Sequence, residues 1–345
     1  MPDIRVINPL DYPHWNSLLH SCPGYSFFHS NAWASVLQET YHYTPAYFAM
    51  LDGSRLIDLI PVMEVDSLLT GKRGVSLPFT DYSDAIFENG NSFKRIFDYI
   101  TEYGRGHGWK SFEMRGGNGL PNGVPASRSK YRHILELSRR PEEILRGFGK
   151  STRRNIQEAV RKGIKVAICN TFDSMQAFRR LNCITRRRHG IPPQPFRFFD
   201  KIYEHVISKN RGFVVLASYE DRVIAGAIFF HFGEKAVWKY NGSERSFHRL
   251  RGNNLILWEA IKWYCQNGYE RICFGRTEPE DEGLRKFKVG WGAREEKEKY
   301  CRYDLGRDEF LEKSWVVTEK YRQIFRRMPP VVLNAIGSML YRHVG

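Results

Sequence analysis

A chain of 345 residues with 14% aromatic residues and a net charge of +15 is long and apolar enough for two packed domains, which excludes a disordered protein. The six cysteines form no C-x-x-C pair, so neither structural zinc nor a disulfide framework is expected. No stretch reaches the ~18 apolar residues of a membrane span, and the first residues have no apolar signal-peptide core. We therefore expect a cytoplasmic protein with reduced thiols.

The first part of the chain predicts a hairpin, a helix and a strand, in that order. Apolar runs around a polar turn predict the hairpin at 47–57, helical spacing predicts the helix at 93–100, and alternating apolar positions predict the strand at 108–114. The aromatic stretch 27–33 favours a buried corner at the start of another helix. The turn-rich residues 116–123 indicate a loop or a domain boundary.

A polar cluster at 77–84 lies between two apolar runs of the first half. It places Asp81 and Tyr82 side by side. The cluster is typical of a turn, and it would equally suit the lining of a cleft.

The second part of the chain predicts more helices and a second set of strands. Pro141 and the acidic residues after it favour a helix start, and Ser151 or Thr152 is the expected cap of the helix that ends before Gly163. The expected helices cover 151–161, 172–188, 196–207 and 255–266, and the expected strands cover 134–137, 164–169, 212–218, 223–232 and 236–241.

The order hairpin, helix, strand thus occurs twice, because 214–224, 257–264 and 268–274 repeat the pattern of the first half. A tandem duplication explains the repeat. The sequence therefore predicts an α/β (α+β) fold of two domains, 1–130 and 131–307, each a mixed sheet flanked by helices.

The tail, 308–345, predicts a helix, Pro329-Pro330 and a second helix, with apolar and basic residues interleaved. A basic amphipathic helix can lie in a membrane interface, or it can pack its apolar face on the domain. Both interpretations stay open.

Three basic segments are candidates for binding anions. Arg186–Arg188 close a helix, where guanidinium groups either bind phosphate or complement the helix dipole. Arg249–Asn254 open a helix, and a helix N-terminus offers N–H groups to a pyrophosphate. Gly283–Gly292 place Lys288 on a basic, aromatic turn.

Four motifs in combination resemble the FemAB-like branch of the GNAT acyltransferases over most of residues 25–305. They are Phe28-His29-Ser30-x-x-Trp33, Ser151–Ile156 with Gly163, Tyr240-x-Gly242-Ser243, and Phe287-Lys288-x-x-Trp291-Gly292. Members of that branch transfer amino acids from aminoacyl-tRNA to peptidoglycan precursors, and others are acetyltransferases, some of them linked to exopolysaccharide systems. The resemblance implies two tandem GNAT-like domains, the second carrying the acyl-transfer site.

The resemblance also implies roles for individual residues. Phe287 and Lys288 would lie beside the acyl-transfer centre, and Lys288 would stabilise negative charge on the carbonyl oxygen. Asp81, if it lines the cleft, would orient or deprotonate the acceptor amine. The other implied site residues are Tyr240, Thr185 and Arg187 for the substrate and Arg249, Arg251, Gly252, Asn253 and Asn254 for the donor. The polar cluster adds Tyr82, next to Asp81, as a further candidate for binding the substrate. No metal is expected.

The sequence departs from the family pattern at two positions. Leu37 stands where peptidoglycan-branch members often carry a lysine, and Asn254 stands where the acetyl-CoA loop usually ends in Gly or Ala.

The predicted function is therefore N-acyl transfer, either acetyl or aminoacyl, to an amine of a cell-envelope or exopolysaccharide precursor. Acyl-CoA or aminoacyl-tRNA is the expected co-substrate, with no tightly bound cofactor. Expected partners are an anionic or phosphorylated precursor, tRNA and the inner face of the membrane, but not DNA. The alternatives are a CoA-dependent acetyltransferase of a soluble small molecule and a non-catalytic module that binds RNA or a membrane surface.

Overall fold

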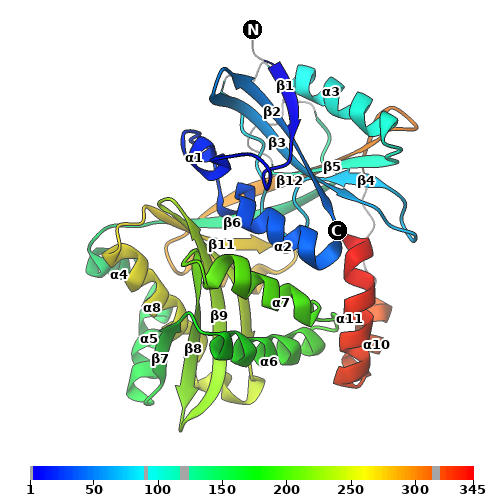
Figure 1. The fold of residues 1–345 in the computed structure, drawn as a ribbon. Helices are drawn as coiled ribbons and strands as arrows, with labels where there is room; N and C mark the ends of the chain where they lie inside the picture. The colour runs from blue at the N-terminus through cyan, green and yellow to red at the C-terminus, as the bar shows by residue number, and fades with distance from the viewer. Residues whose placement is uncertain (1–2, 89–91, 117–123, 313–318) are drawn as a thin grey trace. The chain divides into compact units, whose positions relative to one another are not determined.

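The computed structural model describes residues 3–88, 92–116, 124–312 and 319–345, and the chain forms two compact units (Figure 1). Unit one comprises Met1–Tyr131, Lys297–Val316 and Met339–Gly345, and unit two comprises Arg132–Glu296 and Val317–Ser338. This division differs from the expected domains at 297–307, because β12 (Arg294–Asp304) pairs with a strand of unit one.

Unit one is built on a mixed sheet in the order β1-β2-β3-β4-β5-β12. Neighbouring strands are antiparallel except for β4 and β5, which are parallel and are connected through α3. The elements are β1 (Asp3–Ile7), α1 (Trp15–His20), a 3-10 turn (Phe27–His29), α2 (Asn31–Tyr41), β2 (Thr44–Asp52), β3 (Arg55–Val65), β4 (Arg73–Val75), α3 (Phe93–Gly106), β5 (Ser111–Arg115) and β13 (Glu309–Leu311), which pairs with β12.

Unit two repeats this arrangement with the sheet order β7-β8-β9-β10-β11. In this order β10 and β11 are parallel and are connected through α8, whereas the pairs β7–β8, β8–β9 and β9–β10 are antiparallel. The elements are β6 (Arg128–Glu136), α4 (Pro141–Gly147), α5 (Lys150–Arg161), β7 (Lys165–Cys169), α6 (Phe172–Arg188), α7 (Phe196–Ile202), a π-helical turn (Tyr203–Ile207), β8 (Gly212–Tyr219), β9 (Arg222–Phe232), β10 (Lys235–Ser243), a 3-10 turn (Arg245–Leu250), α8 (Gly252–Gln266), β11 (Arg271–Thr277), α9 (Glu282–Val289), α10 (Glu319–Arg327) and α11 (Pro330–Val344).

The two units therefore share one order: strand, helices, hairpin, strand, helix, parallel strand. The predicted tandem α/β fold, with mixed sheets flanked by helices, is confirmed. Beyond the exact bounds, two local expectations are wrong: the side-chain cap of α5 and the helical start of the tail. α5 begins at Lys150 without a side-chain cap, the hydroxyl of Thr152 donates instead to the carbonyl of Gly290 (2.9 Å), and the start of the tail forms β13 rather than a helix.

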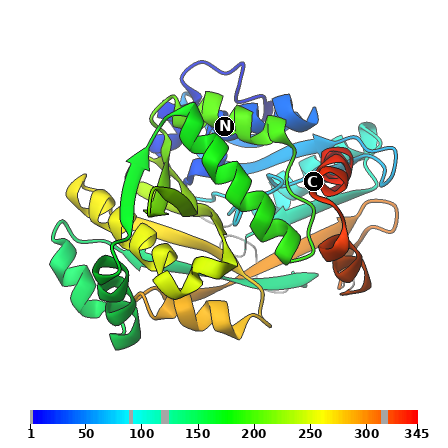
Figure 2. The same ribbon diagram turned by 90° about the horizontal axis from the view of Figure 1, so that it is seen from below.

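Helices cover both faces of the sheet in unit two, and alternate residues of β9 show which helix covers which face. Ala225 and Ala227 belong to the core cluster that contains α8, whereas a Cβ on Gly226 would meet Phe178 and Leu181 of α6. Successive side chains of a strand point to opposite faces, so α6 and α8 lie on either side of the sheet (Figure 2). The candidate functional site described in the next section lies beside the first turn of α8.

The aromatic stretch at 27–33 forms the expected buried corner in unit one. Phe27, Phe28 and Trp33 are fully buried and meet edge to face. The Ser26 and His29 side chains form a reciprocal capping box at the 3-10 turn. All six cysteines of the chain are free.

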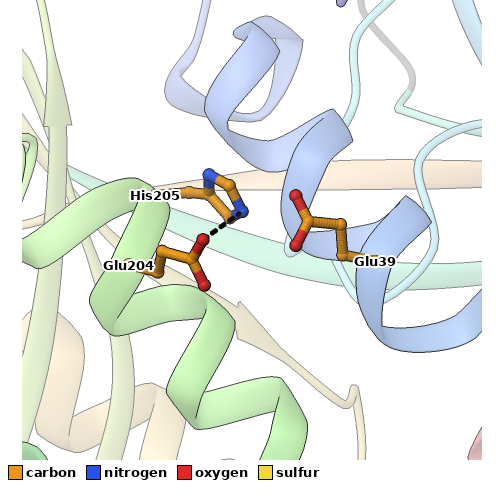
Figure 3. Close-up of side chains that lie close together, drawn as sticks. All are labelled: Glu39, Glu204 and His205. Atoms are coloured by element: carbon orange, nitrogen blue, oxygen red, sulfur yellow. Dashed lines mark ion pairs between the residues drawn. The ribbon is translucent and has the colours of Figure 1, made fainter.

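The expected helix 196–207 is α-helical only as far as Ile202, and it continues as one π-helical turn before β8. In this turn the Glu204 carboxylate lies 3.9 Å from the His205 ring nitrogen Nε2 (Figure 3). The predicted loop at 117–123 and the tail residues 313–318 lie outside the described residues.

Candidate functional site

The strands β10 and β11 separate after a short parallel pairing, and this opens a site in unit two. Their pairing covers Lys235–Val237 opposite Arg271–Cys273. A bulge between Trp238 and Tyr240 shifts the register of β10 on β9, and β10 then continues to Ser243 along β9. In unit one the equivalent strand β4 has only three residues. The extra length of β10 thus distinguishes the second copy.

A pocket of about 320 Å³ lies at this point, between β10, α8 and α9. Its apolar lining includes Trp238 and Phe287, whose rings are 6.3 Å apart. Its polar lining includes the first turn of α8. The complete lining is Asn155, Ile224, Ala225, Trp238, Asn241, Ser243, Glu244, Phe247, His248, Arg251, Gly252, Asn253, Asn254, Leu284 and Phe287. An apolar recess with a few convergent polar groups is typical of a small-molecule site.

Among the residues that the structure describes, three polar atoms of this lining are buried and have no hydrogen-bond partner: Trp238 Nε1, Asn241 Oδ1 and Asn253 Oδ1. An unsatisfied buried polar group costs about 1–3 kcal/mol, so natural proteins keep few of them. A ligand that offers an acceptor to Trp238 and donors to the two amides would remove this cost.

The first turn of α8 makes one wall of the pocket. Arg251 caps the helix in the left-handed conformation (φ 62°), and its carbonyl accepts from the N–H groups of Asn254 and Leu255. The N–H groups that precede these have no partner within a helix, and the helix dipole makes this end positive. The wall is therefore suited to an anionic group such as a phosphate.

Ion pairs hold the loop before α8 in place. Lys162 binds both the Glu158 carboxylate (2.6 Å) and the carbonyl of Arg249 (2.7 Å), and Arg251 lies 3.6 Å from Glu158. The one carboxylate in the pocket lining, Glu244, pairs with Arg180 (2.6 Å) and Arg222 (2.5 Å). Because these arginines neutralise Glu244, it does not cancel the positive character of the α8 terminus.

A serine and a histidine meet in the pocket wall. Ser243 Oγ lies 3.0 Å from His248 Nε2, and Asn253 Nδ2 donates to the same hydroxyl (3.4 Å). Desolvation, with the charges of Arg188 and Arg245, lowers the pKa of His248 below its usual 6.5. The imidazole is consequently neutral at pH 7 and can accept a proton. His248 was not predicted as a site residue. Its contact with Ser243 depends on the 3-10 turn after β10, which no pattern in the sequence indicates.

The predicted donor-binding residues mostly come together, whereas the predicted substrate residues separate. Arg251, Gly252, Asn253 and Asn254 line the pocket with Phe287, and Arg249 contributes only the carbonyl that Lys162 binds.

Thr185 lies beside the end of β10, where its hydroxyl accepts from the N–H of Ser243 (2.9 Å). Tyr240 packs its ring on Phe198 and Phe199 and does not line the pocket. Arg187 lines a different pocket, formed by α6, α10 and α11.

Lys288 lies in α9, a helix, so the expected turn is wrong. The side chain of Asp281 caps this helix by accepting from the N–H of Leu284. Lys288 is only 3% exposed, and its ammonium donates to the carbonyls of Gly275 (3.0 Å) and Arg276 (3.2 Å) at the end of β11. Phe287, the residue before Lys288 in the sequence, lines the pocket. The buried ammonium therefore belongs to the residue that follows a lining residue in α9.

Asp81 and Tyr82 belong to unit one. Asp81 is 8% exposed, and its carbonyl accepts from the hydroxyl of Tyr300 (3.2 Å). The ring of Tyr82 meets Phe28 edge to face at 5.7 Å. Both residues remain predicted site residues.

His133, a buried histidine of unit two, is affected by the charge of Lys288. His133 Nε2 is 2.9 Å from the Glu295 carboxylate, which also binds Arg285. Burial, with the charge of Lys288, lowers the pKa of His133 to about 4. His133 is therefore neutral in the folded protein near pH 5, while an exposed histidine is protonated there.

This difference predicts how stability depends on pH. Between about pH 6.5 and 4 the unfolded chain binds a proton at His133 and the folded chain does not, so the free energy of unfolding falls as pH falls, by up to about 3 kcal/mol. His133→Gln is expected to flatten this decline in urea denaturation measured from pH 7 to 4. The exposed His107→Gln is the control, and equal pH slopes in both variants would contradict the assignment.

Comparison with known proteins agrees with this geometry. The family model described as an acetyltransferase (GNAT) domain matches residues 148–298, which contain the whole pocket. The structure is similar to that of FemX, at 13% identity and a TM-score of 0.67, over 94% of this chain and 100% of that chain. No curated protein matches the sequence.

Two further structures have a similar fold. L-PGS from Bacillus licheniformis is 12% identical with a TM-score of 0.57, over 98% of this chain and 99% of that one. A tandem GNAT protein from the clavulanic acid biosynthesis pathway is 10% identical with a TM-score of 0.56, over 89% and 98%. Residues 148–298 thus match an acetyltransferase (GNAT) domain, and the fold of the chain is similar to that of FemX over nearly its whole length.

Proposed function

We propose that this acyltransferase takes an acyl group from acyl-CoA bound in the α8 pocket and transfers it to an amine of a cell-envelope or exopolysaccharide precursor. The observation that carries the donor assignment is the pocket itself. A phosphate suits the N-terminus of α8, and the apolar side chains of Trp238 and Phe287 in the lining suit the apolar part of a donor. The acceptor class rests on the family resemblance and on the predicted substrate residues Thr185 and Arg187.

The reaction needs only groups that the chain supplies. The amine attacks the thioester carbonyl, a C–N bond forms, and the C–S bond breaks as the tetrahedral intermediate collapses. The amine loses one proton and the departing thiolate gains one, which leaves an amide and free CoA. Lys288 is proposed to stabilise the negative charge on the carbonyl oxygen, and neutral His248 to accept the amine proton. Asp81 keeps its predicted role of orienting the acceptor amine.

Donor binding is tested by placing a charge in the pocket without changing its shape. Asn253→Asp puts a carboxylate where a phosphate would bind, so the Kd for acetyl-CoA is expected to rise at least about tenfold, or ~1.4 kcal/mol. An acidic residue in the first turn of a helix does not itself destabilise the helix. Isothermal titration calorimetry measures the change, and Asn267→Asp, at the other end of α8, is the control.

The same titration separates the donors. Binding of aminoacyl-tRNA without binding of acetyl-CoA would replace the proposed donor and keep acyl transfer. Failure of both to bind to the wild-type protein would overturn the proposed function and favour a non-catalytic module.

A further inference from the structure

A second pocket of unit two lies between α6, α10 and α11, and its lining residues differ from those of the α8 pocket. Its volume is about 370 Å³. Its lining contains three arginines, Arg187, Arg188 and Arg326, and no carboxylate from the described part of the chain. The remaining lining is Cys183, Ile184, Pro193, Pro330, Leu333 and Asn334. The pocket therefore combines concentrated positive charge with an apolar floor.

The start of α11 is fixed to unit two, so this surface is part of the folded structure. Leu333 is 1% exposed, and a Cβ on Gly337 would overlap the carbonyl oxygen of Pro193. α10 packs against α6. The predicted packing of the tail on the domain thus accounts for one face of these helices, and their other face remains exposed.

α10 and the start of α11 carry large apolar side chains that are exposed. Val331 is 79% exposed, Tyr321 52%, Ile324 51% and Val332 45%. A further recess of about 570 Å³ lies beside Ile324 and Arg327. We call these four apolar residues, with Arg187, Arg188, Arg326 and Arg327, the α10–α11 corner. Exposed apolar residues that gather at one place mark an interaction surface more often than single exposed ones do.

Two of the charges at the corner are available to an outside partner. The side chains of Arg187 and Arg327 form no ion pair within the part of the chain that the structure describes. Guanidinium groups bind phosphate oxygens bidentately. A partner that matches the corner must therefore carry several phosphates for the arginines. It must also have an apolar region next to these phosphates that the exposed apolar side chains can enter.

We propose that the α10–α11 corner docks on an anionic phospholipid surface, with lipid phosphates in the arginine-lined pocket and Ile324, Val331 and Val332 in the acyl-chain boundary. Such docking is peripheral. Within the described residues no helix has both the length and the apolar composition to cross a bilayer. A soluble phosphate ester would satisfy the arginines but would leave the apolar residues in water, so the lipid surface is the better match.

The test is sedimentation of the full chain with vesicles of phosphatidylcholine alone or mixed with phosphatidylglycerol. We expect binding only to the mixed vesicles, and weaker binding as salt rises. The double variant Arg327→Glu with Val331→Asp should reduce the partition coefficient at least about tenfold. Arg327→Glu turns an attraction to the anionic lipid into a repulsion, and Val331→Asp puts a carboxylate where an apolar side chain would enter the acyl-chain boundary.

The matched control is Val160→Asp with Arg161→Glu, an exposed pair on α5 with the same change in charge. It should bind like the wild type. Equal losses in both variants, equal binding to both vesicle types, or binding to single-stranded RNA with none to vesicles would overturn the proposal. Circular dichroism melts verify that both variants fold, and Val331→Ala, which removes apolar surface without adding charge, should weaken binding to a smaller extent.

Discussion

Replacing Lys288 with methionine is expected to lower turnover by a factor of about 10²–10³, equivalent to ~3–4 kcal/mol of transition-state stabilisation. The ammonium is almost fully buried against the carbonyls of Gly275 and Arg276, beside the pocket-lining Phe287. A charge in such a place interacts strongly, because little water screens it. Methionine keeps the length of the side chain and removes the charge.

Lys286→Met is the matched control, since Lys286 lies in the same helix but pairs with Glu282 at the surface. Single-turnover kinetics at saturating donor would separate chemistry from binding. The expected result is a lower rate with an unchanged donor Kd. Unchanged turnover in a folded Lys288→Met protein would show that Lys288 has no part in catalysis.

The repeated architecture is predictable from the sequence because its signals are local. The hairpin at 47–57 and its counterpart at 214–224 show as apolar runs around polar turns, and β2–β3 and β8–β9 form there. The order of these elements was sufficient to predict a tandem fold. The bounds of β12 and β13 depend instead on pairing with distant strands, which no local pattern reveals.

The site was predictable only where a local signal exists. The basic, glycine-containing loop before α8 indicates an anion site, and most of its residues line the pocket. The early end of the β10–β11 pairing depends on the register between strands far apart in the chain. The roles of Trp238, Asn241 and His248 in the lining therefore could not be read from the sequence.

The segment around Lys288 shows a missed signal. Its flanking glycines favour a turn, and yet Asp281 stands three residues before Leu284, at the spacing of a helix cap. If the cap spacing at Asp281 is given more weight than the flanking glycines, the sequence predicts the helix α9.

Replacing Trp291 with alanine is expected to be the most destabilising single change in unit two. Trp291 is fully buried directly after α9, with its ring 4.9 Å from Phe148 and 6.1 Å from Phe287. The cavity left by such a truncation costs about 3–5 kcal/mol, which lowers the melting temperature by roughly 6–20 °C for a unit of this size.

The consequence for activity follows from the position of Trp291 between the core and the site. Its ring supports Phe287, which lines the pocket, and the chain just before it binds α5 through the Gly290 carbonyl and Thr152 (2.9 Å). Loss of this support should let α9 shift, so turnover should fall even below the new melting temperature. Trp291→Phe keeps most of the volume and should cost less than about 1.5 kcal/mol. Calorimetry measures the melting temperatures of Trp291→Ala and Trp291→Phe. Similar melting temperatures for the two variants would show that the aromatic ring at position 291 does not hold α9 against the core.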